Sequence, residues 1–133
     1  MKTQILTDCL RQAFKLNPRH PEVKNGYHHF SFIIQGNQIL GHGYNRGGGC
    51  KPLYGYKPHQ KLHSENTAYF KVKGILSNRD SFEMVNIRLT KAGESRINKP
   101  CVCCLNFLNG LGCSVVWFTT GCNSYPWARI NVK

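Results

Sequence analysis

Two short stretches, His63-Ser64-Glu65 and Pro100-Cys101-Val102-Cys103-Cys104, decide how this sequence is interpreted. Each stands where a strand is expected to give way to a helix. Cys101 and Cys104 are three residues apart, so they share one helical face. The positive end of a helix lowers the pKa of a nearby thiol and favours the thiolate, which is the form that binds metals. Together the two stretches predict a metal site made of His63, Cys101 and Cys104.

The composition of this site favours catalytic zinc. Two thiolates and one imidazole make three zinc ligands, and a catalytic zinc keeps its fourth position for water. Glu65 is the only acidic residue between Glu22 and Asp80, so ordinary surface charge explains it poorly. A carboxylate beside an activated water can accept a proton and then deliver it. We therefore expect Zn²⁺ as cofactor and Glu65 as the catalytic acid and base.

Two other interpretations of these motifs have to be weighed. A structural zinc site would add a fourth protein ligand such as Cys103, Cys50 or His59, but it leaves Glu65 and Pro100 unexplained. A redox C-x-x-C would need a thioredoxin-type context, which is missing. H-x-E followed by P-C-x-x-C is the signature of zinc deaminases, in which the glutamate is not a metal ligand.

Hydrophobic periodicity along the chain predicts alternating helices and strands. We expect helices at residues 2–16, 64–73 and 101–109, strands at 27–35, 38–44, 81–90 and 114–120, and loops at 45–62 and 91–99. Gly36-Asn37 is typical of a tight hairpin turn, and the last dozen residues show no clear period. The order predicts a single domain, residues 1–133, of the α/β class. Its expected architecture is a three-layer α/β/α sandwich with a central mixed sheet.

Residues 27–120 resemble the cytidine deaminase superfamily. Gly41-His42-Gly43-Tyr44-Asn45 is similar to the G-x-G-[YW]-N strand end of that superfamily. The segment from His63 to Ala68 is similar to the H-A-E-x-x-A of its deoxycytidylate and tRNA-adenosine deaminase branch, with Ser64 in place of the usual alanine. Family members commonly continue with another helix and a fifth strand, so we expect a C-terminally shortened version of the fold.

The resemblance also implies roles for individual residues. His63, Cys101 and Cys104 would bind zinc, and Glu65 would move protons. Asn45 would hydrogen-bond the base or the sugar. The backbone amides of Ser64 and Glu65 would line the base-binding site, and the carbonyl of Lys99 would accept a hydrogen bond from the leaving amine.

The charge of the chain bears on the substrate. Eighteen Lys and Arg residues against six Asp and Glu residues give a net charge of +12. This excess favours polyanionic partners or phosphorylated ligands, with solubility alone as the alternative. The loop at 45–62 mixes cations with aromatic side chains, as single-strand binding sites do. Its candidates for substrate contact are Arg46, Lys51, Tyr54, Tyr56, Lys57 and Lys61.

Two aromatic residues near the end of the chain are further candidates. Tyr125 and Trp127 follow the last expected strand. In polynucleotide cytosine deaminases of the superfamily that the chain resembles, the loop after the corresponding strand contacts the neighbouring base. Simple packing is an equal alternative for these two residues, as it is for Tyr54 and Tyr56.

Three functions follow from these observations. The first is deamination of cytosine to uracil in single-stranded DNA or RNA. The second is deamination of free (deoxy)cytidylate or cytidine, and the third is non-enzymatic nucleic-acid binding around a zinc ion, against which Glu65 argues. Adenine or guanine as the target base also stays open.

The cysteines and the apolar runs predict where the protein resides. Seven cysteines are an odd number, and no export signal accompanies them. We therefore expect free thiols and a cytoplasmic location. No apolar run reaches about 18 residues, so we expect no membrane partner. The oligomeric state is left open.

Overall fold

The structure is a computed structural model, which describes residues 2–20, 28–45, 63–76 and 81–132, apart from the side chains at 102 and 103. The helices are α1 (Lys2–Leu16), α2 (Ser64–Val72) and α3 (Val102–Asn109), with a 3-10 turn, η1 (Asn17–Arg19), after α1. The strands are β1 (His28–Gln35), β2 (Gln38–Tyr44), β3 (Phe82–Leu89), β4 (Ser95–Arg96), β5 (Cys113–Thr119) and β6 (Trp127–Asn131). None of these helices is long and apolar enough to cross a membrane.

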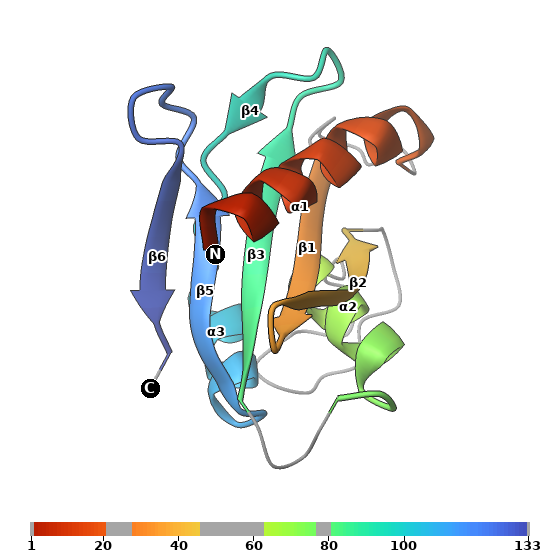
Figure 1. Cartoon of the computed structure of the whole chain (residues 1–133), viewed down its shortest axis with the longest axis vertical. Helices are drawn as coiled ribbons and strands as arrows, with labels where there is room; N and C mark the ends of the chain where they lie inside the picture. Colours follow the sequence, from red (N-terminus) through yellow and green to blue (C-terminus); the bar gives the residue numbers. More distant parts are fainter. Residues whose placement is uncertain (1, 21–27, 46–62, 77–80, 133) are drawn as a thin grey trace.

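The strands form one mixed sheet in the order β2-β1-β3-β5-β6, with β4 paired to β3. β3 and β5 run parallel, and the other described pairs are antiparallel. Helix α1 covers one face of the sheet, while α2 and α3 cover the other (Figure 1). The expected three-layer α/β/α sandwich with a central mixed sheet is confirmed.

The two core clusters follow from the alternation of side chains along the strands. Phe30 and Phe32 of β1 point toward α1, where Leu6 and Cys9 are buried. Ile33 points to the opposite face and packs with residues of α2 and α3. Both faces of the central strands are therefore buried, and a polar residue placed there needs a hydrogen-bond partner.

The C-terminal part of the chain differs from the sequence-based expectation. Residues 127–131 form β6, which pairs antiparallel with β5, and residues 95–96 form the short strand β4 within the expected loop. The connection from β5 to β6 contains Gly121 at a φ of +81° and no helix. The residues of β6 are only partly buried or exposed, so they show no hydrophobic alternation. The strand forms because β5 offers it main-chain partners, which hydrophobic periodicity cannot show.

Gly43 lies where strand β2 passes under helix α2. A Cβ atom there would lie 2.3 Å from the backbone N of Ala68 and 2.7 Å from the carbonyl carbon of Thr67. Both neighbours are backbone atoms, which cannot move aside like a flexible side chain. The glycine therefore lets α2 lie directly on the sheet, and that places His63 and Glu65 at the helix start over the strands.

Replacing Gly43 with alanine should lower the free energy of unfolding by about 1–3 kcal/mol, because the strand and the helix must separate. Thermal or urea unfolding measures this loss. Gly74→Ala is the matched control, since a Cβ at Gly74 meets no atom of the described residues within 4 Å. A Gly43→Ala protein as stable as the control would contradict the close approach of β2 and α2.

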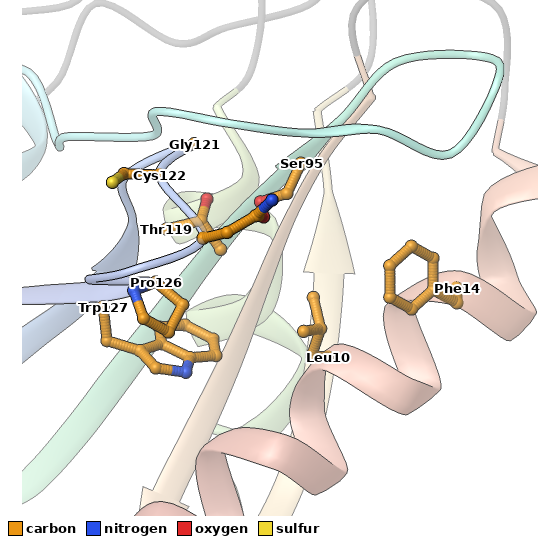
Figure 2. Close-up of a pocket in the computed structure, with 9 residues that line it drawn as sticks. Leu10, Phe14, Ser95, Thr119, Gly121, Cys122, Pro126 and Trp127 are labelled. Atoms are coloured by element: carbon orange, nitrogen blue, oxygen red, sulfur yellow. The ribbon is translucent and has the colours of Figure 1, made fainter.

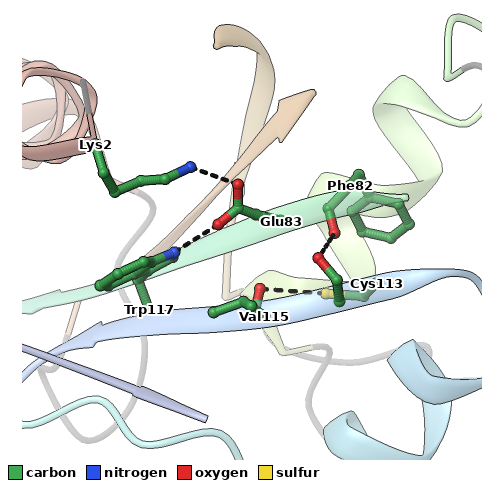
Figure 3. Close-up of polar contacts among 7 residues, drawn as sticks. Lys2, Phe82, Glu83, Cys113, Val115 and Trp117 are labelled. Carbon is green, nitrogen blue, oxygen red and sulfur yellow. Dashed lines mark hydrogen bonds and ion pairs between the residues drawn. The ribbon is translucent and has the colours of Figure 1, made fainter. Parts of the chain in front are cut away.

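A polar contact connects helix α1 to the face of the sheet that it covers. Lys2 forms an ion pair with Glu83 of β3, and Glu83 also accepts a hydrogen bond of 2.8 Å from Nε1 of Trp117 (Figure 3). Burial acts to raise the pKa of Glu83, but the hydrogen bonds from Lys2 and Trp117 outweigh it and lower the pKa. The ionised carboxylate is therefore the form that the fold stabilises.

Lys2→Met should reduce stability at pH 7 by about 0.2–1 kcal/mol, the range for partly exposed ion pairs. Because the pKa of Glu83 is lower in the folded protein than in the unfolded chain, its ionisation stabilises the fold at pH values above the unfolded pKa. This stabilisation is lost as the pH falls through the folded pKa. The difference between the wild type and Lys2→Met should therefore shrink as the pH falls below about 4. Lys15→Met, an exposed change on the same helix, should leave the shape of the stability–pH profile unchanged.

Candidate metal centre and its carboxylate

Two helix N-termini meet at the candidate site. His63 is the N-cap of α2, and Cys101 is the N-cap of α3. The Cys101 sulfur accepts a hydrogen bond of 3.4 Å from the backbone N–H of Cys104, which satisfies one free donor at the start of α3. Each helix precedes one of two neighbouring parallel strands, α2 before β3 and α3 before β5, so both helix N-termini lie at the edge of the sheet where those strands end.

The three side chains expected to bind a metal lie together. Their donor atoms lie within 4.8 Å of one another. Nδ1 of His63 is 3.2 Å from Sγ of Cys104 and 3.4 Å from Sγ of Cys101. Cys104 is fully buried, whereas Cys101 is open to solvent. The cluster therefore has a closed inner side and an accessible outer side.

The local electrostatics favour the charged form of Cys101. The hydrogen bond with Cys104 lowers the pKa of the Cys101 thiol to about 3, with a further contribution from His63. The hydrogen bond to Cys101 in turn raises the pKa of His63. A sulfur that is ionised at neutral pH is ready to bind a soft or borderline cation.

The donor set fits zinc. Two cysteine sulfurs and one imidazole nitrogen are common zinc ligands, and three protein ligands leave one position open for water. Glu65 does not belong to the group of donor atoms. Two candidates for a fourth protein ligand, Cys50 and His59, lie outside the described residues, and the side chain of Cys103 is not described either.

Glu65 is buried behind the cluster, with 5% of its surface exposed. Its Oε2 accepts a hydrogen bond of 2.9 Å from Nδ2 of Asn86, and its Oε1 lies 3.4 Å from Oγ of Ser64. Burial raises the pKa of Glu65. A raised pKa makes the carboxylate a stronger proton acceptor than an exposed glutamate, as a general base requires.

The structure also describes three residues expected to contact substrate, Asn45, Ser64 and Lys99. Asn45 follows β2 and is buried, and its Oδ1 accepts a hydrogen bond of 2.9 Å from the backbone N–H of His29 and lies 2.7 Å from Nε2 of His20. The hydroxyl of Ser64 points into the protein, 2.7 Å from Oγ of Ser31. The Lys99 side chain is exposed. The side-chain oxygen of Asn45 is thus held by groups of the protein, and its contact with substrate stays a prediction.

The structure adds residues that sequence reasoning missed. Ser31 and Asn86 lie behind Glu65: Asn86 donates a hydrogen bond to its carboxylate, and Ser31 contacts the hydroxyl of Ser64. His29 Nδ1 lies 2.8 Å from Oδ1 of Asn98, and Nδ2 of Asn98 is buried with no hydrogen-bond partner among the described residues. These polar residues sit in or beside strands of otherwise apolar sequence, and that placement was the only signal that could have revealed them.

Of the other expected substrate contacts, the structure describes Trp127 and Tyr125. Trp127 packs against the α1 face of the sheet, where it lines a pocket opposite Leu10 and Phe14 (Figure 2). Tyr125, in the turn before β6, is 76% exposed. The remaining candidates lie outside the described residues: Arg46, Lys51, Tyr54, Tyr56, Lys57 and Lys61.

Solved structures of deaminases share this fold. The chain is similar to a dCMP deaminase from the cyanophage S-TIM5 at 20% identity and a TM-score of 0.59, over 90% of this chain and 86% of that one. The cyanophage enzyme has also been solved in complex with dCMP and dUMP. A cytidine deaminase from Burkholderia pseudomallei is similar at 17% identity and a TM-score of 0.58, over 94% and 91% of the two chains. No protein-family model and no curated protein matches the sequence.

The fold and the cluster define an α/β/α domain with a His-Cys-Cys group at two helix starts and a buried glutamate beside it. The solved dCMP deaminase and cytidine deaminase structures have the same fold, so the fold that the sequence resemblance implies is confirmed.

Proposed function

We propose that the protein is a zinc-dependent hydrolytic deaminase that converts cytosine to uracil. The observation that carries this proposal is the convergence of three metal-donor atoms within 4.8 Å, next to a buried glutamate. A purely structural metal site does not need a buried carboxylate of this kind. Burying one is unfavourable unless it is paired or used.

His63, Cys101 and Cys104 would hold the zinc ion. When bound, zinc supplies a water nucleophile that is activated at neutral pH. Glu65 takes a proton from the attacking water and delivers it to N3 of the ring. The water oxygen bonds to C4 of the ring, and Glu65 then moves the remaining hydroxyl proton to the amine at C4. The C4–N bond breaks, so water and cytosine give uracil and ammonia. The Lys99 carbonyl would accept a hydrogen bond from the amine as it leaves.

We propose single-stranded DNA or RNA as the substrate, because the net charge of +12 exceeds what one phosphate group needs. The candidates in residues 45–62 would contact the phosphates and bases. Free (deoxy)cytidylate or cytidine is the second candidate. It is favoured by the similar cyanophage enzyme, whose structure was solved with dCMP and dUMP. The cytoplasmic location and a cytosine target, rather than another base, stay predictions.

The deciding experiment incubates the zinc-loaded protein with dCMP, cytidine, single-stranded DNA and RNA, and measures uracil and ammonia. Polynucleotide binding should weaken steeply with salt, with a slope of log affinity against log salt of about −0.7 for each phosphate contact. Mononucleotide binding should weaken little. Turnover of dCMP alone would establish the second candidate, and a full zinc site without any turnover would establish a structural metal.

A further inference from the structure

Three buried polar side chains stand behind Glu65 that the proposed reaction does not use. Ser31 of β1, Asn86 of β3 and Ser64 of α2 are 0%, 0% and 2% exposed. Ser31 and Asn86 are direct partners across the antiparallel β1–β3 ladder. Their neighbours on the same face, such as Ile33 and Met84, belong to the apolar core under α2 and α3. Polar groups in such a place are unfavourable unless they are hydrogen-bonded.

The hydrogen bonds among them form a closed network with Glu65. Asn86 Nδ2 lies 2.9 Å from Glu65 Oε2, and Ser31 Oγ lies 2.6 Å from Asn86 Oδ1. Ser64 Oγ lies 2.7 Å from Ser31 Oγ and 3.4 Å from Glu65 Oε1. Both ends of the Asn86 amide are therefore occupied, one by the carboxylate and one by a serine hydroxyl.

The direction of each hydrogen bond follows from the donor inventory. The NH₂ group of Asn86 faces the carboxylate oxygen, so Oδ1 faces Ser31 and can only accept. The single hydroxyl hydrogen of Ser31 is then given to Asn86, and Ser31 must accept from Ser64. The Ser64 hydrogen is thereby used at 2.7 Å, which leaves only a weak contact at 3.4 Å with Glu65 Oε1.

We propose that Asn86, held in place by Ser31, is the positioning residue that fixes Oε2 of Glu65 and leaves Oε1 as the oxygen that exchanges protons. The inference rests on the proposed function for its catalytic consequence, though the positioning itself does not depend on turnover. A carboxyl group that rotates freely would present its two oxygens in many orientations. Catalysis needs the reacting oxygen held within a few tenths of an ångström.

The test uses two substitutions that disrupt this network, a third, Ser31→Thr, that keeps the hydroxyl, and one matched control. Asn86→Leu keeps the shape of the side chain and removes its donor and acceptor, and Ser31→Ala removes the hydroxyl that holds the Asn86 amide. Asn17→Leu is the control. Asn17 is also a buried asparagine with both ends used, by Thr90 O at 3.0 Å and by His28 Nδ1 at 2.6 Å, but it touches no part of the candidate site.

Two readouts separate positioning from mere stability. Crystal structures of the variants show whether the Glu65 carboxylate keeps its orientation, and this readout needs neither zinc nor turnover. Steady-state kinetics on the substrate that the zinc-loaded wild type deaminates gives kcat and KM separately. Metal analysis records the zinc content of each variant.

In Asn86→Leu we expect a rotated Glu65 carboxylate, a kcat about 10–100-fold lower and a KM within about threefold of wild type. Ser31→Ala should lower kcat by about 3–10-fold, and Ser31→Thr, which keeps the hydroxyl, should restore it. Zinc should stay near one per chain in all of them. Asn17→Leu should lower the melting temperature while kcat stays near the wild-type value.

An unmoved Glu65 carboxylate in Asn86→Leu would overturn the proposal, as would a kcat loss no larger than that of Asn17→Leu. If Asn86→Leu does not fold, the same measurements on Ser31→Ala decide. A wild type that deaminates none of the substrates refutes the proposed function. In that case the crystal structures still decide whether Asn86 positions Glu65.

Discussion

Glu65→Gln should reduce turnover by at least about 10²–10⁴-fold while zinc content stays near one per chain. Glutamine keeps the size of the side chain, and its amide oxygen can still accept the hydrogen bond from Asn86 Nδ2 that Glu65 Oε2 accepts at 2.9 Å. It cannot take or give a proton at neutral pH. Since one residue would serve several proton transfers, the loss should fall at the upper end of the range. Uracil release and metal analysis on the same sample test this expectation.

The same substitution carries a stability signature in the metal-free protein. Burial raises the pKa of Glu65, so the unfolded chain loses this proton at a lower pH than the folded one. The wild type should therefore lose stability relative to Glu65→Gln as the pH rises from the unfolded pKa, about 4.3, through the folded value. Wild-type turnover in Glu65→Gln would remove the residue from the mechanism. A stability difference independent of pH would contradict its burial.

Cys104→Ser should empty the metal site and abolish turnover. The sulfur of Cys104 is 3.2 Å from His63 Nδ1, and the residue is fully buried, so solvent cannot easily replace the missing ligand. A serine hydroxyl remains protonated at neutral pH and is a poor zinc ligand. Zinc content should fall from near one to near zero per chain under dialysis that leaves the wild type loaded. The thermal stabilisation that added zinc gives the wild type should vanish as well.

Cys9→Ser provides the matched control for this loss. Cys9 is equally buried, but it lies in the core between α1 and the sheet. Burial raises the pKa of its thiol to about 12, so it stays a protonated core residue. Cys9→Ser should lower stability by about 1–3 kcal/mol, as expected for a buried polar group, and keep its zinc. Full zinc occupancy in Cys104→Ser would refute the assignment of Cys104 as a ligand.

The sequence predicted most of the secondary structure because most elements carry a hydrophobic period. α1 and β2 have the expected bounds, residues 2–16 and 38–44, and α2, α3, β1, β3 and β5 differ by one residue at one or both ends. The exceptions are β4 and β6. Their residues are at most partly buried, so main-chain pairing with β3 and β5 decides their conformation.

The residues of the candidate site also fall into two groups, those that the sequence predicts and those that only the structure reveals. The candidate metal ligands and the candidate proton carrier are predictable from sequence, since His63, Glu65, Cys101 and Cys104 stand in short motifs whose residue types and spacing follow from zinc and proton chemistry. Ser31 and Asn86 have no such motif. A lone polar residue in a strand has no period and no spacing, so its partners are visible only when strands and helices are packed together.

By itself, then, the sequence determined which residues could bind a metal and move a proton, and which segments are helices. Only the tertiary structure determined that these residues lie close together. His63 and Cys104 are 41 positions apart, yet they lie in contact because β3 and β5 pair in parallel and Gly43 lets α2 rest on the sheet. It also decided that Asn86 and Ser31 hold Glu65, and that Trp127 packs beside α1. Hydrogen-bond geometry and close packing depend on the distances between elements, and local sequence patterns do not contain those distances.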